Sequence, residues 1–510
     1  MNKINIWRQG QSHLAAANPG ETLYDVLSKQ NIKIPAPCGG NGTCGKCVVN
    51  SSEGEILSCQ TFAADVTDVY LDSPDEKALI VLDSYDSQRP FESNRTGSYG
   101  IAIDIGTTTI ALEMVRQGTV PYPSQLGELG NYPLSHSRRI ASYSIANSQR
   151  SFGADVVTRI RQATQGAQAQ LHACISNDIT QGIKSLLEKS GVPTNEITTV
   201  AIAGNTTMLH LLQNMPCDTL GVFPFTPVDI NMRHCLFPEV FGDTLSSAEL
   251  LILPGISTFV GADIAAGILC CQIPSDPNPN LIIDLGTNGE MALFSPNRTI
   301  VTSTAAGPAF EAANISCGTA SIPGAIATVR YLPENNVFMY ETIDNQPPIG
   351  ICGTGVVDIA AELVRHSLTD ETGRLEEPFF DKGVELTPGV IFTQKDMREI
   401  QLAKSAVRSG IEILLDVAGY GYNDIGKVYL AGGFGHRINM DSAVTLGLIP
   451  PKLAGKIVTV GNTSLGGAAH VLLSKKAETD IKALASQAEE VNLSTHPRFN
   501  DLFMEHMMFE

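Results

Sequence analysis

The sequence LIIDLGTNGEMAL, Leu281–Leu293, determines how the rest of the chain is interpreted. Two apolar runs flank a short turn of Gly, Thr and Asn residues, and this pattern predicts a β-hairpin. In such a turn, glycines let backbone N–H groups approach an anion, Thr287 adds a hydroxyl donor, and Asp284 can hold a metal ion or a water. A single glycine-rich hairpin is more often an ordinary turn, so this motif needs support from elsewhere in the chain.

A second copy of the motif provides that support. Tyr99–Leu112, YGIAIDIGTTTIAL, again places an aspartate, Asp104, near the end of an apolar run and follows it with a glycine and hydroxyl side chains. Two such hairpins predict two related lobes that each present a loop to one phosphate chain.

Four cysteines in the first part of the chain predict an iron–sulfur cluster. Cys38, Cys44 and Cys47 lie in the glycine-rich segment CGGNGTCGKC, and Cys59 follows in GEILSCQT. Thiolates that converge from such a loop suit a cluster, and the glycines let the backbone wrap around it. Zinc is an alternative, although zinc ribbons pair two C-x2-C knuckles. A structural role alone is the least favoured reading, because cysteines clustered in this way rarely serve packing only.

The composition is that of a globular chain without a nucleic-acid function. Its 510 residues are enough for two to four domains, and 43% of them are hydrophobic and 17% charged. A net charge of −19 argues against nucleic acid as a partner. The N-terminus lacks the apolar core of a signal peptide, and Pro254, Gly261 and Asp263 interrupt the most apolar stretch, so we expect no membrane span. We therefore expect a cytoplasmic protein whose cysteines are ligands or thiols.

The positions of the motifs divide the chain into six segments. We expect an iron–sulfur domain over residues 1–84, a polar linker over 85–98, lobe I over 99–275 and lobe II over 276–457. Residues 458–475 are expected to form a strand and a helix that return to lobe I, and residues 476–510 a C-terminal tail.

Three further segments place small or polar residues where a helix or turn follows a strand. Asn205 and Thr206 in AGNTTMLHLL either cap a helix or add an anion site at its N-terminus. Gly432 and Gly433 in KVYLAGGFG predict a nucleotide-base or phosphate turn. The segment FVGADIAAGILCC, Phe259–Cys271, predicts a helix whose small residues allow close packing, as at a hinge between the lobes.

Two observations stay open at this stage. Glu311 lies in a loop-to-helix stretch and is either an active-site residue or a surface charge. The long helix predicted over Asp396–Tyr420 carries Lys404 and Arg408 on what we expect to be a basic face.

The motifs together resemble those of a known superfamily. The order DIGTTT, GADIAAG, DLGTNGE and LAGGFG resembles the actin, sugar-kinase and heat-shock-chaperone (ASKHA) ATPases, which carry a first phosphate hairpin, a connecting helix, a second phosphate hairpin and an adenosine turn. The cysteine-rich segment resembles [2Fe–2S] domains of the plant and adrenodoxin type. The whole chain, including QLAKSAVRSGI, resembles the reductive activators of corrinoid enzymes.

This resemblance implies a fold, a function and a set of site residues. The fold is multidomain α/β, with a small β-grasp-like [2Fe–2S] ferredoxin domain followed by a two-lobed actin-like (ASKHA, RNase H-like) ATPase. The function is to use ATP, with Mg²⁺, to return the Co(II) corrinoid protein of a methyltransferase system to Co(I), with electrons from an external low-potential donor. Whether the chain forms a homodimer stays open. The residues implied for catalysis are Asp104, Asp284 and Glu290. The residues implied to bind the nucleotide are Gly106, Thr107, Thr108, Asn205, Thr206, Gly286, Thr287, Asn288, Gly289, Gly432 and Gly433. The residues implied to hold the cluster are Cys38, Cys44, Cys47 and Cys59.

Three other functions remain compatible with the sequence. One is a small-molecule kinase with an attached ferredoxin, although no motif for a substrate base stands out. A second is an activator of radical dehydratases, whose own ATPase holds the cluster between subunits instead of in an added domain. A third is a redox-sensing scaffold in which the nucleotide only sets the shape of the protein.

Overall fold

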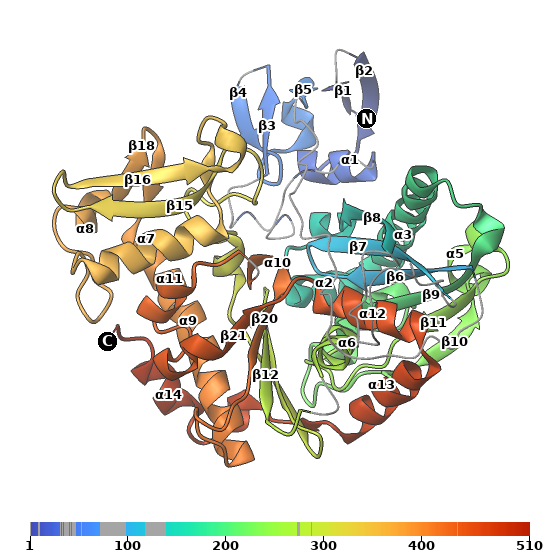
Figure 1. The fold of residues 1–510 in the computed structure, drawn as a ribbon. Helices are drawn as coiled ribbons and strands as arrows, with labels where there is room; N and C mark the ends of the chain where they lie inside the picture. The colour runs from blue at the N-terminus through green and yellow to red at the C-terminus, as the bar shows by residue number, and fades with distance from the viewer. Residues whose placement is uncertain are drawn as a thin grey trace, which may run out of the picture.

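Two six-stranded sheets, which match in the order of five of their strands, form the centres of two lobes in the structure, a computed structural model (Figure 1). It describes residues 2–8, 11–30, 32, 34, 40, 42, 47–52, 54–71, 98–117, 139–272, 276–286, 288–435 and 437–509. The strands of the first sheet are β6 (Tyr99–Ile105), β7 (Thr109–Arg116), β8 (Arg139–Ala146), β9 (Ile197–Gly204), β10 (Arg233–Leu236) and β11 (Glu249–Ile252). Those of the second are β12 (Asn280–Leu285), β13 (Gly289–Phe294), β14 (Thr299–Thr304), β20 (Val428–Ala431), β21 (Ile457–Thr459) and β22 (Glu489–Glu490).

Each sheet begins with an antiparallel meander and continues with parallel strands. In lobe I, β6, β7 and β8 form the meander, and β9 and β11 follow in parallel on the other side of β6. In lobe II, β12, β13 and β14 form the meander, followed by β20 and β21. The two central strands, β6 and β12, are apolar runs with almost every residue buried, as expected for strands covered on both faces. The expectation of two related lobes is confirmed.

Helices cover both sheets. In lobe I these are α2 (Val156–Gln162), α3 (Gln168–Ser190), α4 (Thr206–Leu212), α5 (Pro238–Phe241) and α6 (Ala262–Cys271). In lobe II they are α7 (Gly353–Arg365), α8 (Phe379–Lys382), α9 (Gln394–Ala418), α10 (Gly432–Gly435) and α11 (Met440–Thr445). The C-terminal helices are α12 (Thr463–Leu473), α13 (Lys475–Gln487) and α14 (Phe499–Glu505). Lobe II also contains the small sheets of β15 (Ala325–Leu332), β16 (Val337–Thr342) and β17 (Gly350–Ile351), and of β18 (Val384–Thr387) and β19 (Val390–Phe392).

The helices α6 and α12 cross between the lobes and hold them together. The apolar side of α12, including Leu465, belongs to the core of lobe I, although α12 follows a strand of lobe II. Conversely, Ile264 and Ile268 of α6 pack with residues of β12 and β13 in lobe II. The close packing predicted for the small residues of α6 is present: a Cβ atom added to Gly467 of α12 would lie 2.1 Å from the carbonyl oxygen of Ala266.

The C-terminal segment differs from the expected arrangement in two respects. Strand β21 pairs with β20 in lobe II, so the helix α12 alone returns to lobe I. The predicted basic face is wrong, because Lys404 of α9 is buried and donates hydrogen bonds to the carbonyl oxygens of His506 (2.6 Å) and Met508 (2.7 Å). A buried ammonium needs such partners, and here the C-terminal segment provides them.

The N-terminal domain is a five-stranded sheet covered by one short helix. Its strands are β1 (Asn2–Arg8), β2 (Gln11–Ala17), β3 (Val48–Ser51), β4 (Gly54–Leu57) and β5 (Asp68–Tyr70), in the order β2-β1-β5-β3-β4. Helix α1 (Leu23–Lys29) starts with a capping box between Thr22 and Asp25 and buries Leu23 and Leu27 in a small core. In Figure 1 this domain, in blue, lies above the two lobes, with α1 on its lower side.

The helix crossing leads to a stability prediction. We expect Gly467→Ala to lower the free energy of unfolding by about 3 kcal/mol, because the new methyl group collides with backbone of α6. Urea unfolding followed by circular dichroism measures this change. The control is Gly455→Ala, whose added Cβ meets no atom within 4 Å and which should change stability by less than about 0.5 kcal/mol. Equal stability of both variants would contradict the close crossing.

Candidate functional site

The first phosphate-type hairpin ends in a tight turn between β6 and β7. The last strand pair is Ile105 and Ile110, and the N–H group of Gly106 donates to the carbonyl oxygen of Thr109 at 2.9 Å. A Cβ atom on Gly106 would lie 2.8 Å from this same oxygen, so the turn requires glycine at this position. The turn places the hydroxyl groups of Thr107 and Thr108 at the end of the hairpin.

Two neighbouring residues hold this turn through its carbonyl groups. The Asn147 side chain donates to the carbonyl oxygen of Gly106 (2.9 Å), and its backbone N–H donates to that of Thr108 (2.9 Å). The guanidinium of Arg159 donates to the carbonyl oxygen of Thr107 at 2.5 Å. In the described chain no hydrogen bond uses the N–H groups of Thr107 and Thr108. The carbonyl oxygens are therefore held on one side of the turn, which leaves these two N–H groups for another partner.

Arg159 is a fully buried cation that the sequence analysis did not single out. Its guanidinium also donates to the carbonyl oxygen of Gly153 (2.9 Å) and to the Gln149 side chain (3.3 Å). Burial lowers the pKa of Arg159 to about 9, and the nearby Asp155 and Glu311 carboxylates oppose this shift. Arg159 is therefore charged at neutral pH and places a positive charge behind the first hairpin.

Buried carboxyl groups from both lobes come together where the hairpins meet. The carboxylate of Asp104 accepts hydrogen bonds from Asn462 and Ser464 at the start of α12, both at 2.7 Å. Burial and repulsion from Asp104 raise the pKa of both Asp263 and Asp284 to about 7. Burial and the same acidic neighbours raise the pKa of Glu290 well above its usual range, although Asn288 donates a hydrogen bond to it. Such a cluster favours a bound cation or bound protons.

Glu311 completes this group and answers the question that the sequence left open. The Thr108 hydroxyl donates to its carboxylate at 3.4 Å, although the two residues lie in different lobes. Its charge also contributes to the raised pKa of Asp284. Glu311 is therefore half-buried where the two lobes meet, beside the first hairpin. Asp263 belongs to the GADIAAG segment, which the sequence analysis assigned only to a packing helix, and Glu311 has no distinctive motif. Their place in the fold identifies both as members of this cluster of carboxyl groups.

The second hairpin meets the glycine turn that follows β20. Gly432 has φ +89°, and a Cβ atom there would lie 2.6 Å from the carboxylate of Asp284. This conformation and this close approach both require glycine. The expected turn and the expected aspartate are therefore neighbours, with Gly433 next to them in α10. Gly286 is open toward Glu311, whose carboxylate lies 3.8 Å from an added Cβ.

Several other expected residues have local structural roles. The Asn205 side chain caps α4 by accepting from the N–H of Met208 (2.9 Å) and also donates to the Thr107 hydroxyl (3.2 Å), so it is both a cap and a neighbour of the first turn. The Thr206 hydroxyl donates to the carbonyl oxygen of Ser257 at 2.6 Å. Gly289 is buried in β13, where a Cβ would lie 2.9 Å from the side chain of Thr304, so packing explains this glycine. Thr287, Cys38 and Cys44 lie outside the described residues.

The two described cysteines of the N-terminal motif are adjacent. The sulfur atoms of Cys47 and Cys59 lie 3.1 Å apart, longer than the disulfide length of about 2.05 Å, and the N–H of Cys59 points to the Cys47 sulfur at 3.5 Å. Cys47 is fully buried. Two converging thiols with a nearby N–H group fit ligands of an iron–sulfur cluster.

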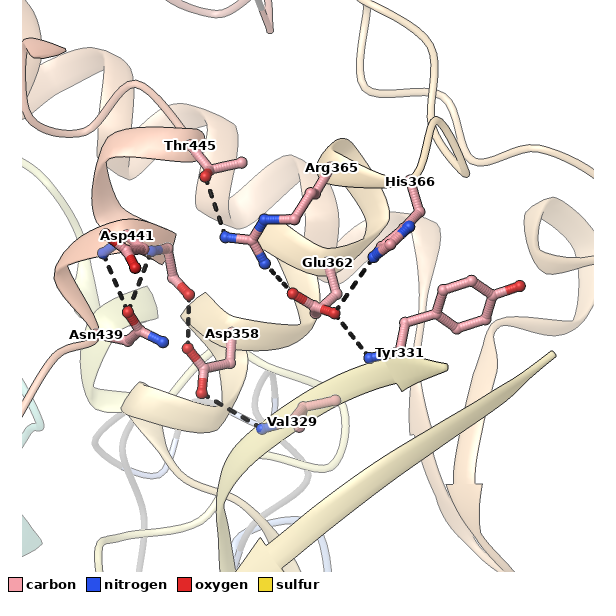
Figure 2. Close-up of polar contacts among 10 residues, drawn as sticks. Val329, Tyr331, Asp358, Glu362, Arg365, His366, Asn439, Asp441 and Thr445 are labelled. Atoms are coloured by element: carbon pink, nitrogen blue, oxygen red, sulfur yellow. Dashed lines mark hydrogen bonds and ion pairs between the residues drawn. The ribbon is translucent and has the colours of Figure 1, made fainter. Parts of the chain in front are cut away.

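A separate cavity of about 690 Å³ lies between β15, α7 and α11 in lobe II (Figure 2). Its two carboxylates already have partners. Asp358 accepts from the N–H of Val329 (3.3 Å) and the Ser442 hydroxyl (2.8 Å), and Glu362 accepts from the N–H of Tyr331 (2.7 Å) and from Arg365. These acids, one helical turn apart, satisfy alternate N–H groups on the part of β15 that lies beyond its short pairing with β17. We therefore assign them a structural role.

Comparisons with known proteins agree with this architecture. The model for the RACo C-terminal domain, the ASKHA domain, matches residues 278–510, and that for the RACo middle region matches residues 129–276. A model for 2Fe–2S iron–sulfur cluster binding domains matches residues 8–71. A solved structure described as a reductive activator for corrinoid, iron–sulfur protein has the same fold, with a TM-score of 0.70 and 23% identity over 99% of this chain and 98% of that chain.

Two curated relatives are similar along most of their length. The corrinoid activation enzyme RamQ of Eubacterium limosum is 27% identical, with 96% of each chain covered. The [Co(II) methylated amine-specific corrinoid protein] reductase of Methanosarcina barkeri is 27% identical over 80% of this chain and 76% of its own.

The fold and the two candidate sites define a class of protein: a two-lobed ASKHA domain preceded by an iron–sulfur domain. Two models of one family match consecutive segments from residue 129 to the C-terminus, and the third accounts for the N-terminal domain. The chain belongs to the RACo family. Within the described residues, no helix has the length and apolarity needed to cross a bilayer.

The raised pKa values predict an unusual pH dependence of stability. Because the folded-state pKa of Asp284 lies near 7 and its usual value is 3.8, this residue contributes stability below about pH 4 that is lost as the pH rises through 7. In metal-free protein, we expect Asp284→Asn to stabilise the fold by about 1–3 kcal/mol at pH 8 and by less at pH 5.5. Thermal unfolding across this range measures the difference. Asp480→Asn, on an exposed face of α13, is the control and should show no such trend. A stability difference for Asp284→Asn that does not depend on pH would contradict the raised pKa.

Proposed function

We propose that this chain is an ATP-dependent reductive activator, which returns the inactive Co(II) corrinoid protein of a methyltransferase system to Co(I). One observation carries the proposal: two phosphate-type hairpins face a shared group of carboxylates, in a chain that also places two cluster-type cysteines side by side. The names of the two curated relatives, both of which act on corrinoid systems, support it. The proposal includes an external low-potential electron donor and a cytoplasmic location.

In this proposal the cleft binds MgATP. The N–H groups and hydroxyls of Thr107 and Thr108, together with Gly286, Thr287 and Asn288, contact the phosphates, and Gly432 and Gly433 lie near the adenosine. In the described residues no three Asp, Glu, His or Cys side chains are arranged to enclose a metal ion. Mg²⁺ typically takes only one or two carboxylates and completes its shell with phosphate oxygens and water.

The carboxylates then have distinct tasks. Asp104 is held in place by two hydrogen bonds from α12, which favour its ionised form and oppose the burial that raises its pKa. Burial raises the pKa of Asp284 to about 7, which suits a general base for the attacking water, and it also raises the pKa of Glu290. Bound Mg²⁺ would relieve the repulsion among these groups, so nucleotide and metal are expected to bind together.

The crossing helices connect this site to a movement of the lobes. Asp263 lies in the first turn of α6, and Asn462 caps α12, so both helices start at the carboxylate group. A nucleotide that binds both hairpins favours a closed arrangement, and its hydrolysis removes that preference. If the potential of the cluster lies about 100 mV above that of the Co(II)/Co(I) couple, the transfer costs about 2.3 kcal/mol per electron. The cycle of ATP binding and hydrolysis can supply this free energy.

The N-terminal domain holds the redox group. Cys38, Cys44, Cys47 and Cys59 would be its ligands, and the [2Fe–2S] cluster supplies a one-electron carrier when bound. Residues 1–84 as this domain, residues 99–275 and 276–457 as the two lobes, and α12 as the return helix make up the domain division that we propose.

The direct test follows the cobalt. A Co(II) corrinoid protein is mixed anaerobically with this protein and a low-potential reductant, and the visible spectrum is recorded with and without MgATP. We expect the Co(I) band to grow only with MgATP. Absence of Co(I) in both cases, across several corrinoid proteins, would contradict the proposal and favour the kinase or the sensor.

Two variants test whether ATP hydrolysis and cluster binding depend on separate residues. We expect Asp284→Asn to reduce ATP hydrolysis at least about tenfold while the visible absorption of the cluster is retained, because it removes the carboxylate proposed as a general base for the attacking water. Cys59→Ser should have the opposite effect, with altered cluster absorption and retained ATP binding. Asp480→Asn and Cys235→Ser are the matched controls. Unchanged ATP turnover in Asp284→Asn would refute its assigned role.

A further inference from the structure

The N-terminal domain contacts lobe I through Tyr24 of α1. The Tyr24 hydroxyl donates a hydrogen bond to the carbonyl oxygen of Ser151, in the short helical turn Ser148–Ser151 that follows β8. The side chain is half-buried, and in Figure 1 α1 faces the region of β7 and β8. These residues lie 127 positions apart in the sequence, so this contact is a feature of the domain arrangement.

The other side of Tyr24 contacts the cluster motif. A Cβ atom on Gly40 would lie 3.0 Å from the Tyr24 ring and 3.9 Å from the Cβ of Cys59. The backbone N–H of Tyr24 donates to the carbonyl oxygen of Ser58 at 2.9 Å. The Tyr24 ring therefore packs against the segment of the N-terminal domain that contains Cys59, and its hydroxyl reaches lobe I.

The turn that receives this hydroxyl is the one that holds the first phosphate-type hairpin. Asn147, immediately before it, binds the carbonyl oxygens of Gly106 and Thr108. Within the turn, the Gln149 side chain accepts from Arg159, which binds the carbonyl oxygen of Thr107. The buried carboxylate of Asp178 fixes the turn by accepting from both the N–H (2.7 Å) and the hydroxyl (2.5 Å) of Ser148.

We propose that Tyr24 is a positioning residue that docks the iron–sulfur domain on the turn 147–151, so that nucleotide in the cleft alters how the cluster domain is held. The proposal rests on the nucleotide binding proposed above. The shared element is the turn 147–151, which contacts every carbonyl oxygen from Gly106 to Thr108 directly or through Arg159. A ligand that binds the N–H groups and hydroxyls of Thr107 and Thr108 would displace the peptide units whose carbonyl oxygens accept hydrogen bonds from the turn and from Arg159. A shift of this rigid turn changes the position of the Ser151 carbonyl, and with it the strength of the Tyr24 hydrogen bond.

The direct test is hydrogen exchange of the complete, cluster-loaded chain, with and without a non-hydrolysable ATP analogue and Mg²⁺. In the native chain we expect the analogue to slow exchange in the hairpin Tyr99–Arg116 and to change exchange in α1. In Tyr24→Phe, which removes only the hydroxyl, α1 should exchange about two- to tenfold faster without nucleotide and should no longer respond to it. This fold-change corresponds to one net hydrogen bond. The hairpin should be protected in this variant as in the native chain.

The control is Tyr70→Phe, a second tyrosine of the same domain, whose ring stacks on Trp7 at 6.2 Å between ring centroids. It should leave the response of α1 to nucleotide unchanged. An equal response of α1 in the native chain and in Tyr24→Phe would overturn the proposal, as would an α1 that ignores nucleotide while the hairpin is protected. If the hairpin of the native chain is not protected, nucleotide binding itself fails, and the docking proposal fails with it.

Discussion

The carboxyl groups buried between the two lobes impose the constraint on which the rest of the structure depends. Asp104, Asp263, Asp284 and Glu290 share a region of low dielectric constant, where like charges raise one another's pKa. Such an arrangement persists only if surrounding structure holds it. Here α6 and α12 provide that support, since each starts at this group and is buried in the core of the opposite lobe. A cation bound at this group would relieve the repulsion.

The same logic explains the first phosphate-type turn. Its carbonyl oxygens bind Asn147 and Arg159, so the polarity of the loop is fixed before any ligand arrives. A turn that is organised in this way needs little rearrangement to receive an anion. The buried positive charge of Arg159 lies next to the loop, where it favours an anion and offsets part of the negative charge of the nearby carboxylates.

The iron–sulfur domain contacts lobe I close to the first phosphate-type turn. Its contact lies on the segment that supports the first turn, far from the C-terminal helices that close lobe II. In this chain, hydrogen bonds thus connect the iron–sulfur domain to the segment that supports the first phosphate-type hairpin. The C-terminal segment has a different task, because it satisfies the buried Lys404 and completes the edge of the second sheet.

The sequence by itself determined the repeated hairpins, the crossing helix, the glycine turn after β20 and the cysteine motif. These features depend on local rules: apolar runs make strands, glycine permits close approach, and thiolates at short spacing bind metal. Only the tertiary structure decided that Asp263 and Glu311 both lie near Asp284, that Arg159 supports the first turn, that Lys404 is buried and that Tyr24 reaches lobe I. Each of these depends on contacts between residues distant in sequence, and no local pattern specifies which distant partner a single charged or aromatic side chain will meet.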